Sequence, residues 1–287
     1  MILRAFVASL GLLAATPAAL AQAPASFVED GPAKTALSWQ YKVKPAGLAG
    51  ELVVQVSAPT TPLAEGEKAA VVFLLDGGWY FGMATDILRM LAVGNEAVPT
   101  YLVAVGYPEA EFRAVMALRE PDLIHKAFAD AAGKKRGGNG AAFERFVMED
   151  LKPFIAARHP IDAERAYLAG QSFGGLFATT VLLNAPESFA GYLIGSPSIW
   201  ANPDLVTQAR AFSSGGGRPV FIGVGGAETQ RMRDGASDIA AALSRPASGL
   251  AVTFTQQEGQ SHGSMQGAWL TDGFKALLKP APAPAPR

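Results

Sequence analysis

The sequence predicts one α/β domain in which a mostly parallel central sheet carries helices on both faces. Short apolar runs rich in Val, Leu, Ile and aromatic residues recur along the 287-residue chain. Several of these runs are continuous, which is typical of strands that are buried on both faces. Helical patterns lie between them, and strands that alternate with helices over a chain of this length indicate a single α/β domain.

The expected strands can be placed in chain order. The first two runs alternate apolar and polar residues more regularly than the later ones, which predicts an antiparallel start to the sheet. The predicted strands are residues 37–43, 51–57, 70–75, 101–107, 166–170, 192–194, 220–224 and 250–256.

The clearest helix is predicted over residues 141–158, where apolar side chains recur as one stripe. Pro153 lies inside this stretch and is expected to kink the helix. Three other segments fit no regular element: residues 133–140 predict a flexible loop, 213–219 a turn before a strand, and 280–287 a disordered Pro/Ala tail.

The first residues predict a secretory signal peptide, because Arg4 is followed by an apolar run and then by small residues. Cleavage after Ala21 is favoured over cleavage after Ala23, since the later site leaves a proline just past the cut. A membrane anchor is the alternative, but the apolar part is shorter than the roughly 20 residues that a spanning helix needs. We therefore expect a signal peptide over 1–21, one domain over 22–279, and export, to the periplasm in a cell with an outer membrane.

The composition argues against several classes of partner. The chain has no cysteine, so disulfides and a lipoprotein anchor are excluded. Its formal net charge is −1, and charges of both signs are interspersed, which argues against nucleic acid or an anionic membrane as the main partner. Three scattered histidines and the lack of a glycine-rich phosphate loop predict neither a metal site nor a cofactor. A small-molecule partner fits this composition better.

The stretch AGQSFGGL contains the pattern Gly-x-Ser-x-Gly with Ser172 at its centre. The glycines of this pattern allow the chain to turn sharply from a strand into a helix. The bare pattern also arises by chance, so its context matters. The preceding RAYLAGQ reads as a strand and the following FGGLFATTVLL as a helix, which favours a nucleophile at Ser172 over a small residue in an ordinary turn.

A nucleophilic serine needs a base that takes its proton. Where a serine occupies this kind of turn, the chain order is serine, acid, histidine. His262 is the only histidine after Ser172, since His125 and His159 precede it. His262 is therefore the predicted base, and a polar loop residue is the alternative interpretation.

The acid and the oxyanion donors complete the predicted site. Glu228 follows the late strand VFIGV and is the favoured acid; Asp234 and Asp204 are the alternatives. The N–H of Phe173, just after the serine, is one expected oxyanion donor. Gly78, in the stretch LLDGGWYF, is expected to supply the second.

Several aromatic and cationic side chains flank the predicted catalytic loops. We expect them to bind substrate, although cations at this spacing also fit a solvated helix face and aromatics near loop ends are often core. These candidates are Trp79, Arg113, Arg119, His125 and Trp200.

The chain resembles the esterase branch of the α/β-hydrolases, which includes enterobactin-type siderophore esterases, esterase D and the mycolyltransferases. The resemblance covers most of the chain after the signal peptide and rests on LLDGG, AVGYP, RAYLAGQSFGGLFA, GSPSIW, VGGAE and SHGSM. It is closest to the periplasmic siderophore esterases and departs from them at REPDL, where a DLTP-like segment is expected near the arginine. The resemblance implies the α/β-hydrolase fold and hydrolysis of an ester, such as a ferric or iron-free siderophore, by a Ser-Glu-His triad or a Ser-His dyad.

Two other functions stay open at this point. An acyltransferase uses the same triad and passes the acyl group to an alcohol instead of water, so only the products distinguish it from a hydrolase. A non-catalytic binding module on the same scaffold is the third candidate. The presence of Ser172, Glu228 and His262 in the required order argues against it.

Overall fold

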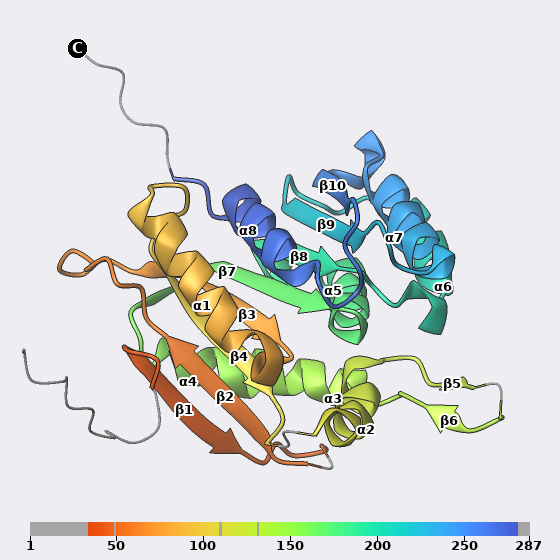
Figure 1. Ribbon diagram of the computed structural model, residues 1–287, viewed down its shortest axis with the longest axis horizontal. Coiled ribbons are helices and arrows are strands. Elements are labelled where there is room, and N and C mark those ends of the chain that lie inside the picture. Colours follow the sequence, from red (N-terminus) through yellow and green to blue (C-terminus); the bar gives the residue numbers. More distant parts are fainter. Residues whose placement is uncertain (1–33, 49, 109–110, 131, 281–287) are drawn as a thin grey trace, which may run out of the picture. The chain divides into compact units, whose positions relative to one another are not determined.

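A sheet of eight strands organises the computed structural model, which describes residues 34–48, 50–108, 111–130 and 132–280. The strand order is β1-β2-β4-β3-β7-β8-β9-β10, and β5 and β6 form a separate two-stranded sheet (Figure 1). The strands are β1 (Ser38–Val43), β2 (Leu52–Ser57), β3 (Ala69–Leu75), β4 (Thr100–Gly106), β5 (Phe128–Ala129), β6 (Lys135–Arg136), β7 (Ile161–Gln171), β8 (Gly191–Gly195), β9 (Pro219–Gly225) and β10 (Ala251–Gln257).

The directions of these strands confirm the predicted sheet. β1 pairs antiparallel with β2, and β2 pairs antiparallel with β4, whereas every later neighbour in the large sheet is parallel. All residues of β3 and β4 are buried, as their continuous apolar runs require. Because the parallel strands end at one edge of the sheet, the loops that follow β3, β7, β9 and β10 meet there.

Helices cover both faces of the sheet. α1 and α8 pack together on one face with one cluster of buried side chains, and the remaining helices pack on the opposite face with a second cluster (Figure 1). The helices are α1 (Gly77–Val93), α2 (Phe112–Leu123), α3 (Gly140–Arg145), α4 (Lys152–Ala156), α5 (Phe173–Asn184), α6 (Asp204–Ala211), α7 (Gln230–Leu243) and α8 (Gln266–Leu277), with short 3₁₀ turns η2 (Pro186–Ser188), η3 (Ile199–Ala201) and η4 (Pro246–Ser248).

The predicted helix over residues 141–158 is present but irregular. It consists of α3, a π-helical segment η1 (Phe146–Leu151) and α4. Pro153 lies just after the π-helical segment and has no N–H to donate, so the backbone bonds of an α-helix cannot continue unchanged through this point.

The prediction of a flexible loop over residues 133–140 is wrong at Lys135–Arg136. These two residues form β6 and pair antiparallel with β5. The guanidinium of Arg136 binds the carboxylates of Glu120 and Asp130. Because Glu120 belongs to α2, this contact is set by the tertiary structure and has no local sequence signal.

The predicted signal peptide (1–21) lies outside the described residues, and so does the predicted tail from residue 281 onward. Among the helices of the described chain, none has the length and apolar character to cross a membrane.

Candidate active site

Ser172 stands at a strained turn between β7 and α5. Its backbone has φ 62° and ψ −117°, a conformation that costs a residue with a side chain on the order of 1–3 kcal/mol. A Cβ atom on Gly170 would collide with the carbonyl of Gly174, so glycine is needed at position 170 for this close approach. Backbone strain of this kind is concentrated at functional sites, because the surrounding structure must hold it in place.

The hydroxyl of Ser172 faces open space beside the sheet edge. Ser172 and His262 both line two neighbouring cavities of about 500 and 470 Å³. The Ser172 Oγ lies 3.4 Å from the Oγ of Ser198, and the Ser172 N–H donates to the carbonyl of Gly195 at 2.9 Å. The predicted nucleophile and the predicted base are thus both accessible to one ligand.

His262 and Glu228 form the pair expected of a base and its acid. The Nδ1 of His262 donates to Oε2 of Glu228 at 2.7 Å, which leaves Nε2 of the ring to exchange a proton. Glu228 follows β9 and His262 follows β10, two parallel neighbours whose ends meet at the same sheet edge. The side chain of Glu228 is 1% exposed and that of His262 is 44% exposed, so the predicted acid is buried behind an accessible histidine.

Glu228 is itself held in place by two further donors. The Ser196 hydroxyl and the Gly225 N–H both donate to Oε1, the latter at 2.9 Å. Burial raises the pKa of Glu228, but the hydrogen bonds from His262, Ser196 and Gly225 outweigh it and leave the pKa below its ordinary value. The carboxylate is therefore ionised at neutral pH and oriented toward the histidine.

The N–H groups of the two predicted oxyanion donors lie in the first turns of two helices. Phe173 begins α5, and Gly78 is the second residue of α1, so neither N–H has an acceptor within its own helix. Within the described chain, no other acceptor takes these two N–H groups. Helix N-termini also stabilise negative charge through the helix dipole.

A buried ion pair fixes the turn that leads into α1, just before Gly78. Asp76, which adopts a left-handed conformation just before α1, accepts from Nε of Arg119 at 2.6 Å and from Nη2 at 2.5 Å. The Arg119 guanidinium also donates to the carbonyl of Gln171 at 3.4 Å and lies 5.4 Å from the ring of Phe173. Arg119 thereby connects the loop before α1 with the turn that holds the serine.

Comparison with known proteins decides the family to which this site belongs. A sequence profile of the family described as "Putative esterase" matches residues 46–278. The chain belongs to this esterase family. The match confirms the resemblance that implied the α/β-hydrolase fold and ester hydrolysis. By family, the protein is an esterase.

Named siderophore esterases are among the relatives of this esterase. It is 31% identical over 245 residues to the ferri-bacillibactin esterase BesA of Bacillus subtilis (strain 168), which covers 78% of this chain and 84% of the relative. It is 33% identical over 206 residues to the siderophore enterobactin esterase of Emericella nidulans, covering 66% and 67%. The crystal structure of the BES protein from Bacillus cereus superposes with a TM-score of 0.76 at 26% identity, over 88% of this chain and 98% of that one.

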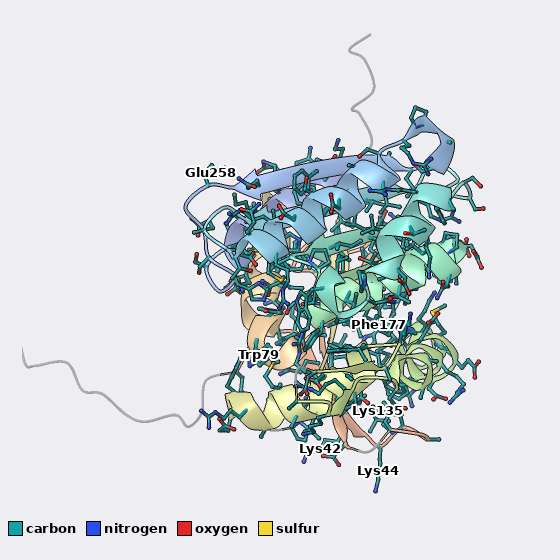
Figure 2. All side chains as sticks on the ribbon, turned by 90° about the vertical axis from the view of Figure 1, so that its right-hand side faces the viewer. Lys42, Lys44, Trp79, Lys135, Phe177 and Glu258 are labelled. Carbon is teal, nitrogen blue, oxygen red and sulfur yellow. The ribbon has the colours of Figure 1, made fainter. Side chains whose placement is uncertain are left out.

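The predicted substrate-binding residues of the esterase divide into two groups. Trp79 and Arg119 line the first cavity and Trp200 lines the second (Figure 2 labels Trp79 at the start of α1). Arg113 is exposed on α2, and neither it nor His125 lines either cavity. Substrate contact by Arg113 and His125 stays a prediction, because neither side chain lines a cavity beside Ser172.

Two buried residues of the site were missed by the sequence reasoning. Ser196 holds Glu228, and Gln171 donates through Nε2 to the backbone carbonyl of His262 at 2.7 Å. The Oε1 of Gln171 accepts from the hydroxyl of Tyr80 at 2.5 Å and from Gln266 at 3.2 Å. Burial, and then the charge of Asp76 nearby, raise the pKa of Tyr80 to about 12, so its hydroxyl remains a donor.

Both residues lie in stretches that the sequence analysis singled out, but nothing in those stretches indicated which side chains they bind. Gln171 occupies a variable position of the pattern around Ser172, and Ser196 begins the SPSIW stretch after β8. Their partners lie far away along the chain, so only the folded structure brings them together.

Proposed function

We propose that this esterase hydrolyses siderophore esters through an acyl-enzyme on Ser172. The observation that carries the proposal is the strained serine beside two cavities that it shares with His262, whose other nitrogen is held by a buried glutamate. The names of two relatives, a ferri-bacillibactin esterase and an enterobactin esterase, support a siderophore as the substrate class.

The proposed reaction runs in two steps with His262 exchanging one proton. In the first, Nε2 of His262 takes the hydroxyl proton while Oγ of Ser172 attacks the ester carbonyl, and the N–H groups of Gly78 and Phe173 bind the oxyanion. The intermediate collapses when His262 gives the proton to the leaving alcohol. His262 then takes a proton from a water molecule, whose oxygen attacks the acyl-enzyme. As the acid is released, His262 returns this proton to Oγ of Ser172.

Glu228 contributes to both steps without touching the substrate. It holds Nδ1 of His262 in the protonated tautomer and stabilises the positive charge that the ring carries after each proton transfer. Catalytic hydrogen bonds between serine and histidine often tighten only in the substrate complex, so the serine and base need not be in contact beforehand.

The first test is mass spectrometry of products formed by wild type and Ser172→Ala. Both proteins are incubated with an iron-free catecholate trilactone, with its ferric complex and with a short acyl ester. Wild type is expected to cleave, and Ser172→Ala is expected to be slower by about 10⁴-fold or more. Ser198→Ala is the matched control, because it removes the neighbouring hydroxyl and leaves the proposed nucleophile.

Each outcome of this test has a distinct meaning. Full activity in Ser172→Ala contradicts the serine mechanism. Cleavage of the short ester alone retains the mechanism and rejects the siderophore substrate, and a transferred ester as the main product indicates an acyltransferase.

We further propose that residues 1–21 are a signal peptide that is removed on export to the periplasm, that 22–279 form the folded domain, and that 280–287 are a disordered tail. The intact mass of the protein recovered from its native cell tests the first point. A mass that starts at Gln22 supports it, and a mass that starts at Met1 contradicts it.

A further inference from the structure

The walls of the two cavities beside Ser172 are aromatic and thioether-rich. The first cavity is lined on its apolar side by residues of α1 and α2, and the second by residues near α5, η3 and α7. Met116 borders both cavities. The apolar lining residues are Trp79, Tyr80, Met83, Phe112 and Met116 in the first cavity, and Met116, Phe173, Trp200, Ala227 and Met232 in the second.

Within the described chain, the charged side chains that line these cavities are Arg119 and Glu228, and both are already paired. Arg119 is 2% exposed; its Nε and Nη2 donate to the two carboxylate oxygens of Asp76, and its Nη1 lies 3.5 Å from the sulfur of Met116. Glu228 accepts from His262 and from two further donors. The cation of Arg119 is thus balanced by Asp76, and the carboxylate of Glu228 adds negative charge near the serine.

The neighbouring arginines lie outside this lining. Arg113 is exposed on α2, one residue after Phe112, and lines neither cavity. The guanidinium of Arg231 lies 4.6 Å from the ring centre of Trp200, and this residue lines a separate depression. Residues 109–110, just before α2, are glutamate and alanine, so the sequence adds no cation there.

We infer that the site selects esters whose acyl and alcohol arms are uncharged near the scissile carbonyl, and that it discriminates against anionic esters. An anion that enters an apolar cavity loses its hydration, and this cost is recovered only where a charge partner or several donors meet it. Here an anionic arm would meet mostly apolar side chains, together with neutral hydroxyl and amide groups, and the carboxylate of Glu228 lies buried behind them. Within the described chain, no cation that lacks a carboxylate partner lines either cavity. The negative charge that develops on the oxyanion during the reaction adds repulsion to this cost.

The inference rests on the proposed function and makes it more specific. A ferric complex of three catecholates carries three negative charges, whereas a ferric complex of three hydroxamates is neutral. The site should therefore prefer a ferric hydroxamate triester to a ferric catecholate trilactone.

A pair of aryl esters of nearly equal size tests charge selection directly. One is the para-nitrophenyl monoester of glutaric acid, and the other has an isopropyl group in place of the free carboxylate. After subtraction of the rate with Ser172→Ala, wild type is expected to favour the uncharged ester by about 20-fold or more in kcat/KM. Equal kcat/KM values, or a preference for the anionic ester, would overturn the inference while leaving the serine mechanism intact.

Two lysine variants test whether the lack of an unpaired cation in the cavity lining causes the preference for the uncharged ester. Met83 is 45% exposed on α1 and Met232 is partly exposed on α7, so a lysine at either position can reach a cavity without entering the core. Met83→Lys or Met232→Lys is expected to reduce the preference by about fivefold or more, and Met83→Leu and Met232→Leu to leave it within about twofold. An unchanged preference in both lysine variants contradicts the electrostatic explanation.

The siderophores themselves provide the last comparison. The ferric hydroxamate triester is expected to be cleaved with at least about tenfold higher kcat/KM than the ferric catecholate trilactone. The reverse order overturns the inference. If neither aryl ester nor siderophore ester is cleaved, the proposed hydrolase function fails first, and the inference fails with it.

Discussion

His262 and His125 each bind a glutamate at nearly the same distance, yet their surroundings differ in every respect that matters for catalysis. The Nδ1 of His262 lies 2.7 Å from Glu228, and the Nε2 of His125 lies 2.8 Å from Glu144. His262 stands at the sheet edge with Ser172 and lines both cavities. His125 lines neither cavity, and its ring stacks on Phe177 with centroids 5.0 Å apart.

The difference extends to the second nitrogen of each ring and to each acid. The Nδ1 of His125 is buried and has no hydrogen-bond partner among the described residues. The side chain of Glu144 is 23% exposed, whereas Glu228 is almost fully buried and held by two further donors. A histidine–carboxylate pair is therefore not a catalytic site by itself, because it also needs a free ring nitrogen next to a nucleophile and a cavity.

Replacing the two histidines gives the largest expected contrast. His262→Ala removes the proposed base and should lower kcat/KM by about 10⁴-fold or more, measured by steady-state hydrolysis of a short ester. His125→Ala should lower it by less than about tenfold, with its main effect on thermal stability through the lost stacking on Phe177. Equal losses of activity in the two variants would show that the comparison is wrong.

Replacing the two glutamates should give a smaller contrast in the same direction. Glu228→Gln keeps the shape of the acid but no longer fixes the histidine tautomer, and kcat is expected to fall by about 10²- to 10⁴-fold. Glu144→Gln serves as the control and is expected to change kcat by less than about threefold. A normal rate in Glu228→Gln would leave a Ser-His dyad or move the acid to another residue.

Ser196→Ala tests whether the extra donors to Glu228 matter. The variant removes one hydrogen bond to a charged acceptor, which contributes about 1.5–3 kcal/mol, and it leaves the Gly225 donor in place. We expect kcat to fall by about three- to thirtyfold with KM little changed, because Ser196 positions the acid and does not touch substrate. Steady-state kinetics would show this split; a change confined to stability would assign Ser196 a purely structural role.

The pH dependence of stability should show the smallest effect. Because the folded-state pKa of Glu228 lies below its ordinary value, its contribution to stability is fully present above that ordinary value and is lost as the pH falls through the folded-state pKa. The difference in free energy of unfolding between wild type and Glu228→Gln should therefore shrink on acidification. Urea unfolding of both proteins at neutral and acidic pH measures it, and a difference that grows in acid would reverse the assigned sign.

The sequence predicted local features better than contacts between distant segments. The eight strands of the large sheet were predicted because an apolar pattern is visible within each segment, alternating in the first two strands and more continuous in the later ones. The strand β6 was missed, since Lys135 and Arg136 have no strand pattern and Arg136 is held by Glu120 on another element. Arg119 was predicted to contact substrate, and it does line the first cavity. The sequence did not show that its Nε and Nη2 bind Asp76, which lies 43 residues earlier.

By itself, the sequence determined the order of strands and helices and the candidates Ser172, Glu228 and His262. These features are encoded by apolar periodicity, by a short glycine pattern and by chain order. Only the tertiary structure decided which histidine–glutamate pair lies beside the serine, and which donors hold that pair. The reason is physical: Ser196 binds an acid 32 residues away, and Gln171 binds a tyrosine 91 residues away, so these contacts exist only after the parallel strands bring their ends to one edge.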